Sequence, residues 1–68
     1  MTFHTTAERR AALRRWASGQ ELITQSAWAR RCGLSATAAR RDFLAIADLL
    51  EPIRQATKVV GYRSKERN

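Results

Sequence analysis

The chain is poor in several residues on which whole classes of protein depend. Its 68 residues include one cysteine and, in His4, one histidine, so an internal disulfide is impossible and no metal site is expected. No apolar run approaches the roughly 20 residues of a membrane-spanning helix, and the first residues show no signal-peptide pattern. We therefore expect a cytoplasmic protein without a membrane segment.

Residue groupings that are typical of catalysis are also missing. No nucleophile stands beside a base, no carboxylates are paired at a useful spacing, and the three glycines form no phosphate-binding loop. We expect neither enzymatic activity nor a cofactor, and no small-molecule effector is evident. We interpret Cys32 as a small residue of the core, and a reactive thiol is the alternative.

Acidic residues are scarce compared with basic ones. The 6 aspartates and glutamates face 13 lysines and arginines, which gives a formal net charge of +7. Residues 1–34 contain six basic and two acidic side chains and residues 35–68 contain seven and four, so the positive charge is not confined to one tail. This distribution is typical of a domain that binds a partner with many phosphates. We expect residues 1–68 to form a single domain.

The N-terminal part of the chain predicts one helix. Thr5 and Glu8 form the capping-box pattern that begins a helix over about 6–17, with residues 1–4 as a loose leader. Gly19 is expected to end this helix as a left-handed stop.

A second and a third helix follow, joined by a tight turn. Thr24 is expected to cap a helix over about 25–32, which Gly33 ends. Ser35 is expected to cap the third helix, over about 36–50. Apolar residues recur along that helix at helical spacing, namely Ala39, Phe43, Ile46, Ala47 and Leu50.

Pro52 prevents further helix, and the character of the sequence then changes. Residues 53–63 are rich in β-branched and aromatic side chains and predict a β-hairpin, although no Asn-Gly or Asp-Gly marks its turn. Residues 64–68 are expected to be a loose tail. The predicted fold class is mainly α with a small β-hairpin: a winged helix-turn-helix of three helices plus a wing.

The residue types around the turn between the second and third helices fit this motif. Ala29 is small enough to let the two helices cross closely, and Gly33 supplies the backbone conformation of the turn. Leu34 and Ala39 are expected to fill the angle between the helices. The opposite side of the third helix is then left free for a groove.

The segment from Leu22 to Ile53 resembles the DNA-binding domain of the DeoR family of bacterial repressors. The resemblance lies in the capped helix and turn ITQSAWARRCGLS and in the recognition-helix motif TAARRDF, followed by the wing-like IRQATKVVGYR. It implies a winged helix whose third helix meets the major groove of DNA.

The chain also departs from that family. Ala38 and Ala39 stand where the family usually has threonine and a branched aliphatic residue, and Pro52 replaces a typical glycine before the wing. The large sugar-phosphate-sensing domain of the family is not among these 68 residues. We therefore expect a small stand-alone regulator of phage or plasmid type.

Candidate DNA-binding residues follow from the position of the third helix and the wing. Arg40 and Arg41 point away from the core and fit guanine or phosphate recognition, the alternative being a solvated pair bonded to Asp42 or Asp48. Basic residues around the hairpin suit phosphate or minor-groove contacts, or else protect a sheet edge by charge. Helix N-termini can add phosphate contacts. The candidate residues are Thr24, Ser35, Ala36, Thr37, Arg40, Arg41, Arg54, Lys58 and Arg63.

The predicted function is that of a sequence-specific regulator of transcription that binds double-stranded DNA, most simply a repressor that occludes a promoter. An excisionase-like protein that bends DNA and a basic module that docks an acidic protein are the alternatives. Leu44 and Leu49 lie off the main apolar stripe of the third helix, so either the first helix or a second subunit covers them. Together with the small size of the module, they favour a homodimer.

Overall fold

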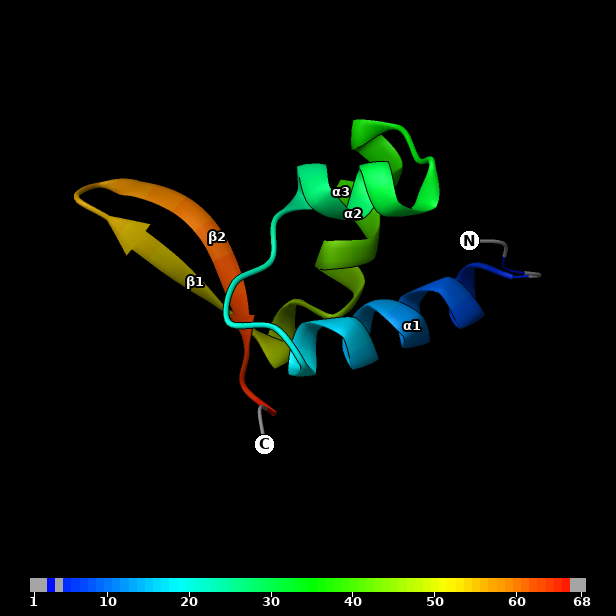
Figure 1. Cartoon of the computed structure of the whole chain (residues 1–68), viewed down its shortest axis with the longest axis horizontal. Helices are drawn as coiled ribbons and strands as arrows, with labels where there is room; N and C mark the ends of the chain where they lie inside the picture. The colour runs from blue at the N-terminus through cyan, green and yellow to red at the C-terminus, as the bar shows by residue number, and fades with distance from the viewer. Residues whose placement is uncertain (1–2, 4, 67–68) are drawn as a thin grey trace.

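The computed structural model describes residues 3 and 5–66, which form three α-helices followed by a β-hairpin (Figure 1). The elements are α1 (Thr6–Ser18), α2 (Gln25–Cys32), α3 (Ala36–Ala45), the short 3-10 helix η1 (Ala47–Leu49), β1 (Leu50–Gln55) and β2 (Lys58–Ser64). The predicted class is confirmed, and the order of the elements is that of a winged helix. None of the described helices is long and apolar enough to cross a lipid bilayer.

Helix α1 begins as predicted but ends differently. The side-chain oxygen of Thr5 accepts a hydrogen bond of 3.1 Å from the backbone N–H of Glu8, so the predicted cap is present. Gly19 has a φ of −96°, and the prediction of a left-handed stop is therefore wrong. Its N–H instead closes a tight turn to the carbonyl of Trp16 at 3.1 Å, which satisfies the helix end without a left-handed residue. The helix extends to Ser18.

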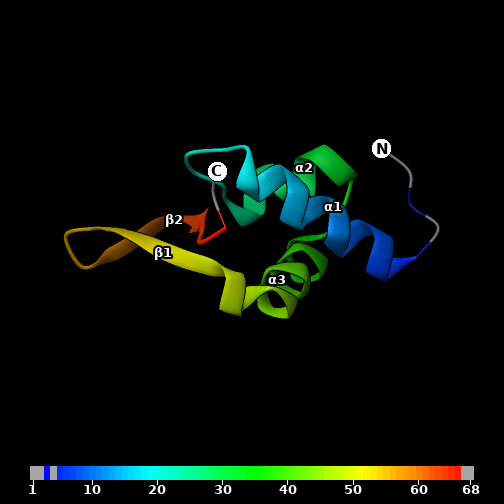
Figure 2. The ribbon, with the colours of Figure 1, turned by 90° about the horizontal axis from the view of Figure 1, so that it is seen from below.

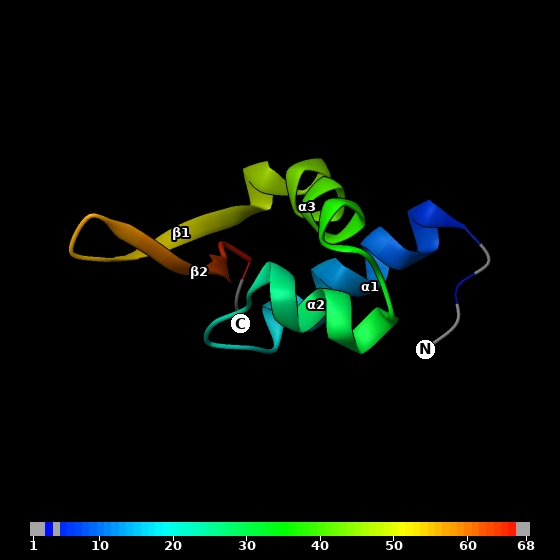
Figure 3. The ribbon, with the colours of Figure 1, turned by 90° about the horizontal axis from the view of Figure 1, so that it is seen from above.

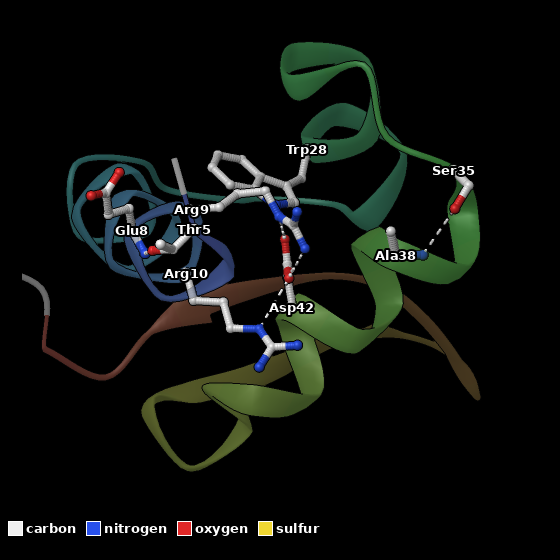
Figure 4. Close-up of polar contacts among 8 residues, drawn as sticks. All are labelled: Thr5, Glu8, Arg9, Arg10, Trp28, Ser35, Ala38 and Asp42. Carbon is white, nitrogen blue, oxygen red and sulfur yellow. Dashed lines mark hydrogen bonds and ion pairs between the residues drawn. The ribbon is translucent and has the colours of Figure 1, made fainter. Parts of the chain in front are cut away.

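The turn between α2 and α3 is built as the sequence predicts. Thr24 accepts a hydrogen bond from the N–H of Ala27, and Ser35 accepts one from the N–H of Ala38, both at 3.1 Å. Figure 4 shows the second of these caps at the start of α3. Gly33 has a φ of +65°, the left-handed conformation for which glycine is best suited.

Helix α3 is shorter than predicted. The expectation of one helix over 36–50 is wrong beyond Ala45, because Ile46 has φ −118°, η1 follows and β1 begins at Leu50. Ile46 and Leu50 are nevertheless buried. A longer helix and the observed path both bury Ile46 and Leu50, so the spacing of these two residues cannot reveal the break. Ala47, which the sequence also placed on the apolar side, is exposed in η1. The pairing of Leu50 with Ser64 across the hairpin decides the outcome.

The hairpin is longer than predicted, and Pro52 lies inside it. Strand β1 begins at Leu50 and pairs with β2 in antiparallel fashion, whereas the sequence predicted strand only within 53–63. Pro52 lies opposite Tyr62, whose backbone N–H and C=O point away from β1 and bond to Ile23 at 2.8 Å. The ring nitrogen of Pro52 therefore occupies a position where the ladder needs no donor, which is how a strand tolerates proline.

The turn of the hairpin has two residues and no glycine. Ala56 and Thr57 connect Gln55 to Lys58. Ala56 has a φ of +58°, a left-handed conformation that is uncommon for alanine. The turn could therefore not be recognised from its residue types.

A close approach between β2 and the segment before α2 fixes the hairpin to the helices. Ile23 and Tyr62 exchange two backbone hydrogen bonds of 2.8 Å. A Cβ atom on the buried Gly61 would lie 2.4 Å from the Cδ1 atom of Leu22 and 2.9 Å from the carbonyl oxygen of Ile23. Only glycine fits at this position.

The hydrophobic core lies where the three helices meet the base of the hairpin. Cys32 and Leu34 pack against it, and Leu49 is half-buried on it. Leu44, in contrast, is exposed. Of the two leucines that favoured a second subunit, Leu49 is thus covered within the chain. The core consists of Leu13, Ala17, Ile23, Trp28, Ala39, Phe43, Ile46 and Leu50.

Part of the tail that was expected to be loose is held in place. Ser64 is buried within β2, and the N–H of Lys65 donates a hydrogen bond of 2.8 Å to η1. Glu66 accepts two hydrogen bonds from Arg14 on α1, at 2.8 and 2.6 Å. The prediction of a loose tail is therefore wrong for residues 64–66. Of the predicted leader, Phe3 is described, and it is half-buried.

The hairpin extends from one end of the helical body, opposite the start of α1 (Figures 2 and 3). Helix α1 contacts α3 and β2, and α2 contacts α3. The α2–α3 turn and the tip of the hairpin lie on the same side of α1 (Figure 1). The chain therefore presents the start of α3 and the hairpin in one direction.

Gly61→Ala is expected to lower the free energy of unfolding by about 1–3 kcal/mol, because the added Cβ atom meets Leu22 and the backbone of Ile23. Urea denaturation measures the loss. Gly19→Ala is the matched control, because the nearest atom to a Cβ at Gly19 is 3.7 Å away and its φ of −96° suits alanine. Equal stabilities of the two variants would contradict the constraint at Gly61.

Candidate functional site

One buried carboxylate joins the three helices. Asp42 on α3 is 0% exposed and accepts hydrogen bonds from Nε and Nη2 of Arg9 on α1, at 2.6 and 2.8 Å (Figure 4). Arg10 Nε donates a third bond at 3.1 Å, and Trp28 Nε1 on α2 donates a fourth at 3.0 Å. We refer to these four residues as the Asp42 cluster. Its carboxylate is fully satisfied, as a buried charge requires.

The cluster keeps Asp42 ionised. Burial by itself raises the pKa of Asp42, but the hydrogen bonds from Arg9, Trp28 and Arg10 outweigh burial, so the pKa lies below the usual value of an aspartate. The hydrogen bond to Asp42 also raises the pKa of Arg9. Helices α1 and α3 are therefore joined at neutral pH by a charge-assisted, bidentate pair.

The exposed face of α3 lies opposite this anchor. Ala39, Asp42 and Phe43 are the buried residues of the helix. Residues three and four apart share a helix face, so the exposed residues form a continuous stripe on the other side. This α3 stripe consists of Ala36, Thr37, Arg40, Arg41, Leu44 and Ala45.

Arg40 and Arg41 have no carboxylate partner. In the described part of the chain, no ion pair includes either arginine. The alternative in which Asp42 or Asp48 binds them is therefore wrong. The reason is geometric, because the Asp42 carboxylate turns inward to α1 while the two arginines before it point outward.

The other cations are divided between internal pairs and open surface. Arg14 on α1 pairs with Glu66, and Arg63 on β2 pairs with Glu51 across the hairpin. The exposed cations for which residues 3 and 5–66 provide no ion pair are Arg15, Arg30, Arg31, Arg40, Arg41, Arg54, Lys58 and Lys65.

The start of α2 connects the α3 stripe with the hairpin. A surface hollow of about 230 Å³ is lined by Thr24, Gln25, Ser26 and residues 59–62 of β2. A second hollow, of about 300 Å³, is lined by Gln25, Ser26, Ala29, Arg30 and Ala36. Because Gln25 and Ser26 line both hollows, the start of α2, the α3 stripe and the hairpin form one continuous surface, which we call the α2–α3–hairpin surface.

The two predicted caps lie on this surface. The side chains of Thr24 and Ser35 each hold one backbone N–H of their helix. The other first-turn N–H groups of α2 and α3 have no acceptor within their own helix, and the helix dipoles favour an anion there. The helix starts can therefore bind phosphate oxygens.

The predicted hairpin residues separate into two groups. Arg54 and Lys58 are exposed beside the turn, at the outer end of the hairpin. Arg63 lies near its base, where Glu51 neutralises it. The structure thus brings Arg54 and Lys58 together at the outer end of the hairpin. Arg63 is not part of this group, because it lies near the base and pairs with Glu51.

Sequence reasoning missed the Asp42 cluster and the position of Gln25 and Ser26. A signal for Asp42 existed, because it lies three residues after Ala39 on the apolar side of the helix, where an ionisable residue needs a buried partner. No local signal marks Gln25 and Ser26, since their position depends on the hairpin lying beside α2.

Other chemistry has little support. Within residues 3 and 5–66, no three side chains of His, Cys, Asp or Glu gather to hold a metal, and His4 lies outside the described residues. Cys32 packs against the core, and burial raises the pKa of its thiol, which disfavours the reactive thiolate. Trp16 stacks on Trp28 with ring centres 5.4 Å apart and has Arg31 over its ring, so both tryptophans are used within the fold.

Comparisons with known protein families, curated proteins and solved structures find no match for this chain. Its function must therefore be inferred from the α2–α3–hairpin surface itself.

Asp42→Asn is expected to lower the free energy of unfolding by about 3 kcal/mol, because the amide leaves two arginines without their counter-ion. Urea denaturation at neutral pH measures this. Glu66→Gln is the matched control: Glu66 also accepts two hydrogen bonds from one arginine, but it is exposed, so stability should stay unchanged. If both variants unfold at the same denaturant concentration, Asp42 is not an anchor.

The Asp42 cluster also predicts a pH dependence of stability. The pKa of Asp42 is lower in the folded than in the unfolded chain, so its stabilisation is complete above about pH 5 and is lost as the pH falls below about 4. The difference in unfolding free energy between the wild type and Asp42→Asn should therefore shrink in acid. A difference that stays constant down to about pH 2 would contradict this.

Proposed function

We propose that the protein is a sequence-specific transcriptional regulator that binds double-stranded DNA, and that it represses by occluding a promoter. In this proposal α3 lies in the major groove, and the hairpin lies along the backbone or in the adjacent minor groove. The observation that carries the proposal is that Arg40 and Arg41 are exposed on the α3 stripe without a counter-ion, because α1 holds the neighbouring Asp42.

The residue types of the α3 stripe suit a groove. Ala36 and Thr37, in the first turn of α3, are small and let the helix come close to base edges. Arg40 and Arg41 follow one turn later, and the arginine fork matches the O6 and N7 atoms of guanine or two phosphate oxygens. A major groove about 12 Å wide admits an α-helix.

The distribution of charge supports a duplex as the partner. On α1, Arg9, Arg10 and Arg14 are bound to carboxylates of the chain itself. Most of the exposed cations without an ion pair lie instead on the α2–α3–hairpin surface, namely Arg30, Arg40, Arg41, Arg54 and Lys58. The unpaired positive charges of this surface suit the row of negative phosphates along a DNA backbone.

A DeoR-type arrangement is part of the proposal. The helix starts capped by Thr24 and Ser35 would meet phosphates on either side of the groove, and Arg54 and Lys58 at the outer end of the hairpin would reach the backbone beyond it. We further propose a cytoplasmic homodimer without a cofactor or catalytic activity, because one module of this size makes too few contacts for useful specificity.

Duplex DNA is expected to bind with an affinity that falls steeply with salt. About five or six neutralised phosphates should give a slope of about −4 to −6 in a plot of log affinity against log salt concentration. Fluorescence anisotropy with a labelled duplex measures the slope. The proposal is wrong if the protein binds no duplex, or if its affinity for the duplex does not change with salt concentration.

Substitutions should separate base recognition from phosphate contacts on a site selected from a random duplex pool. The wild type should bind the selected site with a more favourable free energy than random DNA. Arg40→Ala or Arg41→Ala should reduce this difference by about 1–3 kcal/mol, the value of one bidentate contact to guanine. Lys58→Ala should weaken binding to both duplexes equally and reduce the salt slope by about one.

Arg15→Ala is the matched control for these variants. Arg15 is also an exposed arginine without an ion pair, but it lies on α1, outside the α2–α3–hairpin surface. Its removal should leave the sequence preference unchanged. If Lys58→Ala abolishes the preference while Arg40→Ala and Arg41→Ala retain it, the roles assigned to α3 and the hairpin are reversed.

A further inference from the structure

Leu44 is the most exposed of the large hydrophobic side chains among the described residues, at 63%. It lies on the α3 stripe, one turn after Arg40 and Arg41, and takes no part in the core. Helix α3 contributes Ala39 and Phe43 to the core instead. The fold therefore does not require an apolar side chain at position 44, and the leucine is presented to solvent together with two arginines.

A second copy of the chain is an unfavourable occupant for this surface. In a two-fold contact centred on Leu44, the same patch meets itself, so Arg40 and Arg41 of both copies would come close together. Helix α3 has no free carboxylate to compensate, because its one acidic residue, Asp42, is buried and bound to α1. The positive charges of these arginines would repel one another, which disfavours such a contact between two copies.

A duplex satisfies both features of the patch. Phosphates and guanine edges attract the arginines, and the major groove offers one prominent apolar group, the C5-methyl of thymine. We propose that Leu44 is a specificity-determining residue that packs against a thymine methyl group, next to a guanine contacted by Arg40 or Arg41. This inference rests on the proposed function and extends it to a base that the arginines do not select.

The spacing along α3 places this thymine. Leu44 follows Arg40 by four residues, which is about 6 Å along a helix axis. Successive bases of one strand are about 3.4 Å apart. The thymine should therefore lie within about three base pairs of the guanine.

The test uses a duplex selected with the wild-type protein from a random pool. Each thymine is replaced in turn by deoxyuridine, which lacks only the C5-methyl group, and the affinity is measured for the wild type and for Leu44→Ala. If a homodimer binds two half-sites, one thymine position in each half-site should be sensitive. A single deoxyuridine at such a position should weaken binding of the wild type about fourfold, which is the effect of removing one buried methyl group. Leu44→Ala should bind the two duplexes equally.

Two further variants make the test specific. Leu22→Ala is the matched control, because Leu22 is also an exposed leucine, at 46%, but lies outside the α3 stripe, so this variant should keep the sensitivity to deoxyuridine. Leu44→Asn keeps the size of the side chain without its apolar surface and should lose the sensitivity. Because Leu44 is exposed, both of its variants should melt at the wild-type temperature.

The inference is overturned if the wild type is indifferent to every deoxyuridine near the guanine, or if Leu44→Ala keeps the sensitivity. It is also overturned if Leu44→Ala dissociates a dimer in sedimentation and leaves the deoxyuridine effect intact, since Leu44 then contacts protein. Duplex binding without a methyl effect leaves the proposed function standing. Failure of the wild type to bind any duplex defeats the proposed function and this inference together.

Discussion

A single buried carboxylate decides how the three helices meet. Asp42 accepts hydrogen bonds from Arg9 and Arg10 of α1 and from Trp28 of α2, so α3 cannot turn about its axis without leaving a buried charge unpaired. Such a loss is worth several kcal/mol in a domain whose total stability is small. The apolar contacts on the same side of α3 are not directional and would tolerate a rotation. The Asp42 cluster therefore fixes which face of α3 is exposed.

This orientation separates structural arginines from those that are free to bind. Arg9 and Arg10 form ion pairs with Asp42. Arg40 and Arg41 are close to Asp42 in sequence, but they lie on the opposite side of the helix and pair with no carboxylate of the described residues. In a chain so rich in arginine, composition alone cannot distinguish the two kinds. The position of each carboxylate does, and it leaves the unpaired charge mainly on the surface that joins α2, α3 and the hairpin.

Features of the fold that depend on neighbouring residues could be predicted from the sequence, and those that depend on distant pairing could not. The caps at Thr24 and Ser35 and the left-handed Gly33 follow from local chemistry, and the candidates on the α3 stripe follow from the helical period. The end of α3 could not be predicted, because the apolar spacing suits a longer helix equally well and strand pairing overrides it. The partners of Asp42 lie 33, 32 and 14 residues away, beyond any local pattern.

The most direct test of this division is proton exchange at the arginine Nε–H groups, observed by NMR with and without a selected duplex. In the free protein, the Nε–H of Arg9 should be protected by Asp42, while those of Arg40 and Arg41 exchange rapidly. A saturating duplex should slow exchange at Arg40 and Arg41 and leave Arg9 unchanged. The account is contradicted if Arg40 and Arg41 are already protected in the free protein, or if the duplex protects arginines of α1 and leaves these two unchanged.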